Sequence, residues 1–563
     1  MRNVLILVVV SYVFLILGNG FLSLTNPDEV FYVQTTKEML QRNSWMTPYL
    51  FGQPQFEKPI LTYWLLRVGL AASGVSGAAA APATPPALAS HSINFASRFF
   101  PAVFAIIGVV ATYFLARLSL KSEKKALLSA FVLASSGLYI GLARTVYTDM
   151  IFSIFILLAL AAFYWAYADS KKRGTGVILF YVFSALAVLT KGPLGFGIPF
   201  LVVAIFLALR RQLRMLLSPH SLWGLAAFLI IALPWYVFVI HRFGNAFTHE
   251  FFYNDHIRRI FEAEHPQNDR WYFYPGSIIL GMFPWSVFVL TSFVQLVARA
   301  VKRNVEPLYP YFACWIFVMF LFFQPAHSKL VSYIFPVFPV FAIMIADQIC
   351  DWVLDQRRAK RLSVPVISCV TLALIPLGLV SARKLYYLYL PSTSLVGGIV
   401  AFFVGLLAIM LILAARRKFL ASVYVLGAML PVLFFLSLLS RGSIDPYLSS
   451  ESACRFLLKN HVVDNTILCS KYFSRGVFYY TGKNVAVIEI NGSGFFSPHP
   501  IPYLDTREKV REFLGTQSPT YCIVDDSSLR HLRDIVEGEM TLDVETKTGN
   551  EYVVRVDAEP LRK

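Results

Sequence analysis

Long apolar runs separated by short polar connections fill the chain from its first residues to about residue 440. A helix needs about 20 apolar residues to cross the hydrocarbon core of a bilayer. The pattern therefore predicts an α-helical polytopic membrane protein. Thirteen spans are expected, at residues 4–24, 95–117, 126–142, 149–168, 176–190, 194–210, 222–241, 275–298, 308–324, 331–349, 364–381, 393–414 and 419–440.

Two parts of this pattern allow a second interpretation. Lys191-Gly192-Pro193 either separates two short helices or kinks one long helix across 176–210. Residues 1–24 have the length of a signal peptide, but no small-residue cleavage site follows Gly20. We therefore expect an uncleaved first span.

Lysine and arginine gather in every second connection between the runs. The clusters lie at residues 121–125, 171–173, 210–214, 299–303, 357–361 and 416–418. Cytoplasmic loops of membrane proteins carry an excess of these residues. The N-terminus is therefore expected in the cytoplasm. The connections 25–94, 242–274 and 325–330 and the tail from 441 are expected outside.

Composition supports a membrane protein and excludes one alternative. The chain is 57% hydrophobic and 15% charged, which is more apolar surface than a soluble protein of 563 residues can bury. The net charge of +17 is spread over clusters between apolar runs, so a nucleic-acid-binding face is not expected. The six cysteines show no CxxC or metal-ligand spacing, which argues against a disulfide framework but leaves one bridge in the tail open.

The tail from residue 441 has a different pattern. Its charges are denser, and short β-like runs alternate with two stretches of helical spacing. The runs lie at 466–469, 485–490, 521–524 and 552–556, and the helical stretches at 450–460 and 506–514. We predict a transmembrane domain at 1–440, with large outer loops at 25–94 and 242–274. An extracytoplasmic α/β domain without a catalytic cluster is predicted at 441–563, with a structural or acceptor-facing role.

The first outer loop carries two unusual pairs of charged residues. Asp28 and Glu29 follow the first span directly, and burying adjacent carboxylates at a membrane boundary is unfavourable unless they are used. The structural alternative is that Asp28 starts a short helix as a cap. Glu57 and Lys58 precede Pro59, where an ordinary interfacial anchor is the alternative. Residues 71–90 are small and proline-rich and predict a mobile loop.

Further polar residues lie at other outer positions. Asp149 begins the fourth span, where a helix cap is the structural alternative. In the loop 242–274, His256 and Arg259 are three residues apart, so on a helix they share one face. Such a face suits a phosphate and a divalent metal, and a solvated charged loop is the alternative. Lys329 precedes a proline-rich apolar run, where its side chain can extend to the interface.

Eight segments resemble the bacterial aminoarabinose lipid A transferases. They are PDEVFY (27–32), FEKPILTYW (56–64), ASRFFPAVF (96–104), RTVYTDM (144–150), TKGPLGF (190–196), NDHIRR (254–259), PW and HSKLVSYIFPVFP (327–339). This family belongs to the GT-C glycosyltransferases, which use lipid carriers and include the protein mannosyltransferases. The resemblance covers residues 1–350 and, by architecture, the weaker part from 351 to 563.

The resemblance implies roles for nine residues. The catalytic carboxylates are Asp28, Glu29 and Asp149. The residues that contact the donor phosphate are Lys58, Arg259, Tyr333 and Lys329. A divalent metal of unassigned identity is implied at Glu57 and His256. The chain departs from the family at Phe31, which stands where the aminoarabinose transferases have an arginine.

Elementary chemistry agrees with these roles. Transfer from a polyprenyl phosphate breaks an anomeric C–O bond and leaves a phosphate dianion, which nearby cations and a metal stabilise. Asp28 would orient or deprotonate the acceptor, or position an acceptor phosphate, which predicts a single displacement with inversion. The expected partners are a polyprenyl-phosphate-linked sugar, an acceptor such as lipid A, another envelope glycan or a protein, and membrane lipid.

The sequence favours an enzyme over two other classes. A transporter or flippase of lipid-linked sugars would place charged residues at the midplane and show paired inverted halves, and neither is visible. A non-catalytic scaffold explains the apolar runs but not the outer cluster of acidic and basic residues. We therefore predict a glycosyltransferase. The resemblance implies the bacterial inner membrane, with the active site and C-terminal domain in the periplasm.

Overall fold

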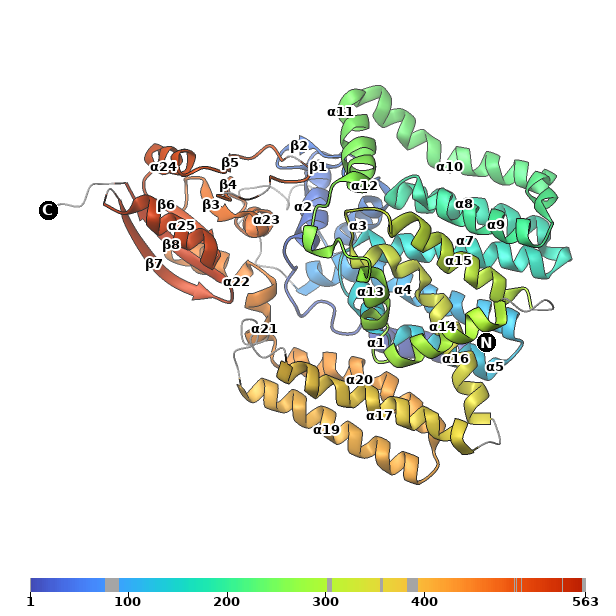
Figure 1. Ribbon diagram of the computed structural model, residues 1–563. Helices are drawn as coiled ribbons and strands as arrows, with labels where there is room; N and C mark the ends of the chain where they lie inside the picture. The colour runs from blue at the N-terminus through green and yellow to red at the C-terminus, as the bar shows by residue number, and fades with distance from the viewer. Residues whose placement is uncertain are drawn as a thin grey trace.

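A bundle of long helices with a sheet domain at one end makes up the chain in the computed structural model (Figure 1). The structure describes residues 2–75, 91–300, 306–354, 358–381, 393–490, 492, 494–497, 499–538 and 540–558. Most of the loop predicted to be mobile at 71–90 therefore lies outside the described residues.

Each of the thirteen predicted runs contains a helix. The helices of the bundle are α1 (Arg2–Leu15), α4 (His91–Leu120), α5 (Glu123–Ala134), α6 (Gly137–Ala143), α7 (Thr148–Ala168), α8 (Arg173–Lys191), α9 (Leu194–Leu209), α10 (Pro219–Phe243), α13 (Phe273–Gly281), α14 (Ser286–Ala300), α15 (Leu308–Phe323), α16 (Phe338–Leu354), α17 (Arg358–Ser381), α19 (Thr393–Ala415) and α20 (Phe419–Leu439).

Length and composition decide how many of these helices can cross a membrane. Among the described residues seven are long and apolar enough, or up to nine if two bent pairs each form one span. The pairs are α5 with α6, bent by 64°, and α13 with α14, bent by 118°. The count of thirteen spans stays a prediction. The ambiguous stretch 176–210 forms two helices, because Gly192 adopts a φ of 112° that ends α8 before Pro193.

Side chains of several helices join at the end of the bundle away from the sheet domain. Asn3 near the N-terminus donates a hydrogen bond of 2.6 Å to Glu123 at the start of α5. Lys125 pairs with Asp347 at 2.5 Å, and Arg299 pairs with the same carboxylate at 2.6 Å. Figure 1 places the N-terminus at this end. Two of the basic clusters predicted to lie on one side, at 121–125 and 299–303, therefore meet at one end.

Short elements at the end of the bundle next to the sheet domain carry the polar residues of the connections 25–94 and 242–274, called below the first and second outer segments. The first outer segment forms α2 (Asp28–Gln41), β1 (Tyr49–Leu50), β2 (Gln53–Pro54) and α3 (Leu61–Ala72). The second forms α11 (Asn245–Thr248), the π-helix η3 (His249–Arg258), α12 (Arg259–Phe261) and the 3-10 turn η4 (Pro266–Asn268). A further 3-10 turn, η5 (Val331–Val337), leads into α16.

The C-terminal domain is built on a six-stranded sheet in the order β5-β4-β3-β6-β8-β7. Its strands are β3 (Ile467–Ser470), β4 (Val485–Ile488), β5 (Tyr503–Leu504), β6 (Thr520–Val524), β7 (Thr541–Thr548) and β8 (Glu551–Asp557). The first four are parallel, and β7 and β8 are antiparallel. The helices are α21 (Arg441–Leu448), α22 (Glu451–Asn460), η6 (Lys471–Phe473), α23 (Ser474–Thr481), α24 (Arg507–Thr516) and α25 (Asp526–Val536). All six cysteines of the chain are free, so no bridge forms in the tail.

All four predicted strands and both predicted helices of the tail are confirmed. The sequence analysis missed β7, whose residues TLDVETKT carry six charged or hydroxyl side chains and only two apolar ones. It also missed α23 and α25, which are 8 and 11 residues long. Short polar elements of this kind gain their stability from packing against the sheet, which the local pattern does not contain.

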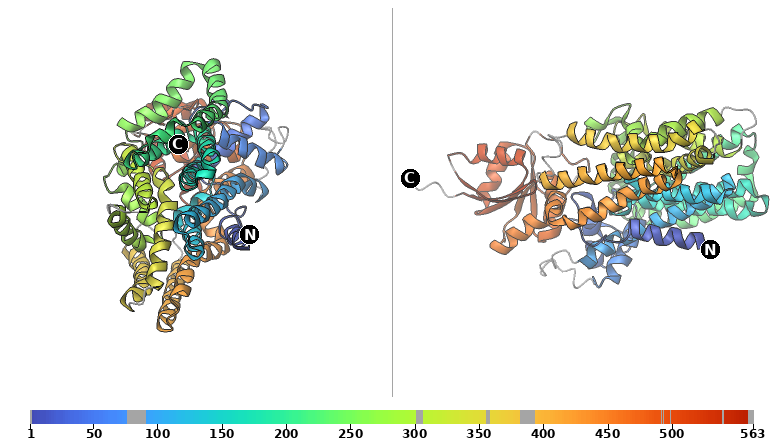
Figure 2. Two further views of the ribbon diagram at one scale, coloured as in Figure 1. Left: turned by 90° about the vertical axis from the view of Figure 1, so that its right-hand side faces the viewer. Right: turned by 90° about the horizontal axis from the view of Figure 1, so that it is seen from below.

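The sheet domain docks directly on the first outer segment. The side-chain amide of Asn26 donates to the hydroxyl of Ser450 at 2.6 Å, and the hydroxyl of Tyr480 donates to the carbonyl of Leu24 at 3.0 Å. A Cβ added at Gly476 of α23 would lie 1.9 Å from Asn26 Oδ1, so these two segments of the chain are in direct contact there. The right-hand view of Figure 2 shows the sheet domain at the same end of the bundle.

Candidate active site

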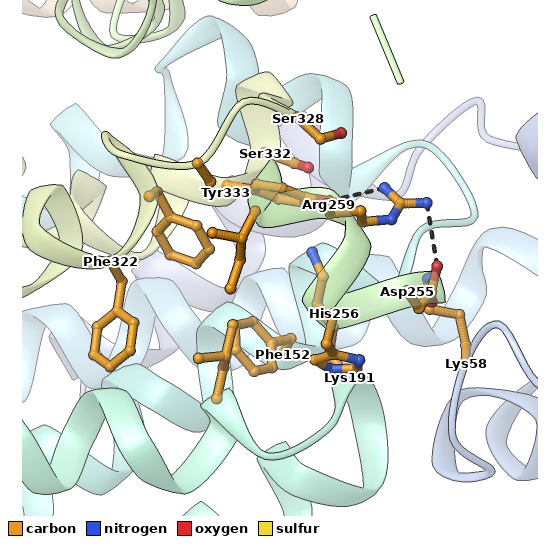
Figure 3. A pocket seen from close by; sticks show the side chains of 14 residues that line it. Lys58, Phe152, Lys191, Asp255, His256, Arg259, Phe322, Ser328, Ser332 and Tyr333 are labelled. Carbon is orange, nitrogen blue, oxygen red and sulfur yellow. Dashed lines mark hydrogen bonds and ion pairs between the residues drawn. The ribbon is translucent and has the colours of Figure 1, made fainter. Parts of the chain in front are cut away.

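A pocket opens where α8, α12 and α15 end, on the side of the bundle that carries the outer segments (Figure 3). Its volume is about 970 Å³ including the mouth. One part of the lining is apolar, formed by Phe152, Leu194, Ile260, Phe322, Phe323 and Ala326. The other part is polar, formed by Lys58, Lys191, Asp255, His256, Arg259, Ser328, Ser332 and Tyr333. A ligand with an anionic head and a hydrocarbon tail matches this division.

Two cations share one carboxylate in the polar part of the pocket. Lys58 Nζ donates to Asp255 Oδ2 at 2.6 Å, and Arg259 Nη2 lies 3.2 Å from Asp255 Oδ1. Burial alone would raise the pKa of Asp255, but the charges of Lys58 and Arg259 hold it below its usual value. The carboxylate therefore stays ionised and holds both cations at the pocket.

Arg259 also connects the pocket to η5. Its Nη1 donates to the hydroxyl of Tyr333 at 3.0 Å and lies 2.8 Å from Glu264. Its Nε is buried and has no hydrogen-bond partner within the described residues. A buried N–H without a partner is unfavourable, so this atom is ready to donate to a bound oxyanion.

Lys191 is the third cation at the pocket. It ends α8 and pairs with Asp149 in the first turn of α7. Its Nζ also lies 4.7 Å from the ring centroid of Tyr333, so this ring stands beside both Lys191 and Arg259. No side chain caps α7 or α2, so the capping alternatives considered for Asp149 and Asp28 are wrong.

The adjacent carboxylates of the first outer segment have different surroundings. The Asp28 side chain is 42% exposed, and its Oδ2 accepts a hydrogen bond of 2.9 Å from the hydroxyl of Tyr147. Glu29 is fully buried, and its two oxygens accept from the guanidinium of Arg98 at 2.8 and 2.6 Å. The backbone N–H of Val146 also donates to Glu29. Asp28 is open to a substrate, whereas Glu29 holds three segments together and has no oxygen left for catalysis.

His256 and Glu57, the expected metal contacts, point to separate partners. His256 Nδ1 lies 2.7 Å from the carbonyl of Phe251, and burial lowers the pKa of His256, so Nε2 keeps a lone pair that suits a metal. Glu57 Oε1 lies 3.5 Å from Arg475 and 4.0 Å from His499. Over the ranges that the structure describes, no group of three or more His, Cys, Asp or Glu side chains is placed to hold a metal. The metal stays a prediction, and no step below is assigned to it.

Lys329 lies outside the pocket lining. Its Nζ donates to Asp269 Oδ1 at 2.5 Å, and its side chain is 4% exposed. The backbone N–H of Ser328 donates to the carbonyl of Arg259 at 3.0 Å. Lys329 therefore fastens the connection 325–330 to the second outer segment. The structure gives no support to the phosphate contact expected for it.

Comparisons with known proteins agree with this geometry. The family model described as dolichyl-phosphate-mannose-protein mannosyltransferase matches residues 1–249. An uncharacterized protein of Aquifex aeolicus is 30% identical over 381 residues, which cover 66% of this chain and 70% of the relative. The undecaprenyl phosphate-alpha-4-amino-4-deoxy-L-arabinose arabinosyl transferase 1 of Sodalis glossinidius is 28% identical over 485 residues, covering 82% and 81%.

A solved structure has the same fold along its whole length. The crystal structure of ArnT from Cupriavidus metallidurans bound to undecaprenyl phosphate superposes with a TM-score of 0.73. The two proteins are 19% identical, and the match covers 98% of this chain and 97% of that one. This chain belongs to the aminoarabinose-transferase-like GT-C glycosyltransferases. It is an enzyme of the class that uses polyprenyl-phosphate sugar donors.

Most members of the predicted site meet in this GT-C enzyme. Lys58, His256, Arg259 and Tyr333 line one pocket, and Asp149 reaches it through Lys191. The shared face expected for His256 and Arg259 is confirmed. The sequence analysis missed Asp255 and Lys191 as site residues. The available signals were an acidic residue next to His256 and a single lysine inside an apolar run before Gly192.

The sheet domain, predicted from the sequence to be structural or acceptor-facing, also reaches the site. Arg475 Nη1 lies 4.0 Å from Asp28 Oδ1, and Arg475 and His499 both approach Glu57. Phe496 of the same domain lies 5.1 Å, centroid to guanidinium carbon, from Arg259. These contacts join residues more than 200 positions apart, so no local pattern in the sequence indicates them.

Proposed function

We propose that this enzyme is an inverting glycosyltransferase that moves one sugar from a polyprenyl-phosphate carrier to an acceptor at the periplasmic face of the bacterial inner membrane. The sugar is an aminoarabinose-like pentose or a hexose, and the acceptor is lipid A or another envelope glycan. The observation that supports the proposal most directly is the pocket, whose cations stand next to an apolar wall.

The donor phosphate is assigned to Lys58, Arg259 and Lys191. Three cations around one phosphate stabilise the negative charge that develops as the anomeric C–O bond breaks, which is commonly the largest catalytic contribution. The unpartnered Nε of Arg259 and the hydroxyl of Tyr333 supply further donors. The apolar side chains of Ile260 and Phe322, which are 47% and 37% exposed, suit the first prenyl units of the carrier.

Asp28 is assigned to the acceptor. Its carboxylate is the exposed member of the first outer pair, and a hydrogen bond from Tyr147 orients it. In the proposed step an acceptor oxygen forms a bond to the anomeric carbon while the bond to the carrier phosphate breaks. The acceptor proton passes to Asp28 and the electron pair to the phosphate. One carboxylate and one leaving group on opposite faces of the sugar give inversion.

The orientation follows from the two ends of the bundle. Basic clusters and the N-terminus share the end away from the sheet domain, which supports placing that end in the cytoplasm. The pocket and the sheet domain are then periplasmic. Labelling single cysteines introduced at Lys171 and at Lys509 with a membrane-impermeant thiol reagent in intact cells and in opened cells tests this placement.

The decisive experiment measures transfer of a radiolabelled sugar from polyprenyl-phosphate donors to a membrane lipid extract. Wild type is compared with Asp28→Asn and with the matched control Asp526→Asn, whose side chain is 67% exposed on the sheet domain. We expect about 100-fold or greater loss of transfer for Asp28→Asn and wild-type transfer for the control. Donor binding by wild type without transfer to any acceptor in the extract would favour a transporter.

A further inference from the structure

Arg475 enters the active site from the sheet domain. It lies at the start of α23, which the close approach of Gly476 to Asn26 holds against the first outer segment. Its Nη1 is 4.0 Å from Asp28 and its Nη2 is 3.5 Å from Glu57. The side chain is 13% exposed, so the guanidinium is a nearly buried cation between two carboxylates.

The guanidinium of Arg475 stacks on the ring of Phe31. The guanidinium carbon lies 4.6 Å from the centroid of the Phe31 ring, within the range of a cation–π interaction. Phe31 is 2% exposed and stands at the motif position where the resembling transferases have an arginine. The cation missing from α2 is thus replaced in space by one from a segment more than 400 residues later.

The geometry leaves donor capacity on Arg475. Nη2 donates to His499 Nε2 at 2.8 Å, and because a guanidinium carries only donors, this ring nitrogen is the acceptor. Arg475 Nε is buried and has no hydrogen-bond partner among the described residues. The 4.0 Å separation from Asp28 is too long for a hydrogen bond. The Nε–H and the N–H groups of Nη1 therefore remain available to an additional anion.

We infer that Arg475 binds a phosphate group of the acceptor and thereby determines acceptor specificity. The inference rests on the proposed function, since it uses the assignment of Asp28 to the acceptor. Arg475 contacts that residue, whereas it does not line the pocket assigned to the donor phosphate, which has Lys58, Arg259 and Lys191. Nε and Nη1 each offer an N–H to a phosphate, and the single ammonium group of a lysine cannot place donors at both positions.

Equilibrium binding of lipid A and of dephosphorylated lipid A to the purified full-length chain tests the inference. The variants are Arg475→Ala, Arg475→Lys, the double variant Phe31→Arg/Arg475→Ala, and the control Arg530→Ala, whose side chain is 70% exposed on the same domain. A lost charge-assisted hydrogen bond corresponds to about 10- to 100-fold weaker binding. We expect this loss for lipid A with Arg475→Ala, a smaller loss with Arg475→Lys, and no change for dephosphorylated lipid A.

The double variant makes the test specific, because an arginine at position 31 returns the cation to the same place from α2. We expect it to recover lipid A binding to within about threefold of wild type. Where transfer is measured, Arg475→Ala should raise the KM for lipid A and leave the KM for the donor unchanged. Thermal unfolding of each variant checks that it is folded, and Arg475→Gln replaces Arg475→Ala if the latter unfolds.

Three results would overturn the inference. The first is an unchanged affinity for lipid A in folded variants that lack Arg475. The second is an equal loss of affinity for lipid A and for dephosphorylated lipid A. The third is a wild type that binds both lipids with the same affinity. Failure of the proposed function is distinguishable from these results. A wild type that binds lipid A through Arg475 but transfers no sugar to any acceptor refutes the transferase, while the contact between Arg475 and a lipid phosphate is retained.

Discussion

Arg259 and Tyr333 are joined by a hydrogen bond of 3.0 Å, although 74 residues separate them in the chain. Arg259 belongs to the second outer segment and Tyr333 to the turn η5 that leads into α16. The bond fixes the guanidinium plane at the pocket, beside Lys58 and Lys191. A fixed cation needs no reorganisation when phosphate charge develops, which is how such sites lower a barrier.

Replacing Arg259 by lysine is expected to lower kcat/KM for the donor by about 10- to 100-fold. The charge remains, but the planar pair of donors and the bond to Tyr333 are lost. Steady-state transfer with varied donor concentration measures the effect. The neighbouring Arg258→Lys, which pairs with exposed Glu262, is the matched control. Equal activity of Arg259→Lys and wild type would contradict the phosphate contact.

Asp149 and Lys191 should act as one unit. Asp149→Asn and Lys191→Met each remove one partner of the same ion pair at the pocket. We expect each single variant to lose most activity and the double variant to lose little more, because effects within one network are not additive. The transfer rates of the four proteins form the double-mutant cycle. Additive losses would show that the two residues act independently.

Glu29→Gln is expected to impair folding more than chemistry. The variant leaves the buried guanidinium of Arg98 without its charged partner, which typically destabilises by about 3–5 kcal/mol. The transition temperature of the detergent-purified protein should fall clearly, whereas Asp28→Asn should leave it unchanged because Asp28 is exposed. A stable but inactive Glu29→Gln protein would restore the catalytic role predicted for Glu29 from the sequence.

Glu551 makes the stability of the sheet domain depend on pH. Burial raises the pKa of this carboxyl from 4.5 to about 8, and Ser450 donates to its Oε1 at 2.7 Å. Between these two values the unfolded chain releases a proton that the folded chain keeps, so stability falls as pH rises from about 4.5 to about 8.

Replacing Glu551 by glutamine removes this group's titration. Thermal unfolding at pH 5 and at pH 9 should show a smaller difference for Glu551→Gln than for wild type, with the variant more stable at pH 9. Glu537→Gln serves as the control, because the Glu537 side chain is exposed in the folded chain. An unchanged pH dependence in Glu551→Gln would show that another group causes it.

Much of the fold and part of the site could be predicted from local patterns. Apolar runs identify helices because a helix makes its backbone hydrogen bonds within the run. Short apolar runs between polar residues identify buried strands such as β6, whose five residues are all buried. His256 and Arg259 could be placed on one face because three residues of helix bring them there. The motif segments pointed to Asp28 and Lys58.

The tertiary structure decided which of these residues are exposed to a ligand and which are buried in ion pairs. Adjacent Asp28 and Glu29 look alike in the sequence, but packing against α4 buries only Glu29 and pairs it with Arg98. From the sequence, Phe31 indicates that a cation is absent at this position. In the structure α23 places the guanidinium of Arg475 over the Phe31 ring. Both outcomes depend on contacts across tens to hundreds of residues, whereas the sequence by itself determined the helices, the strands and the chemical types available. Local periodicity indicates whether a segment is a helix or a strand and which of its faces is apolar. Only three-dimensional packing decides which distant charged side chain pairs with a given residue.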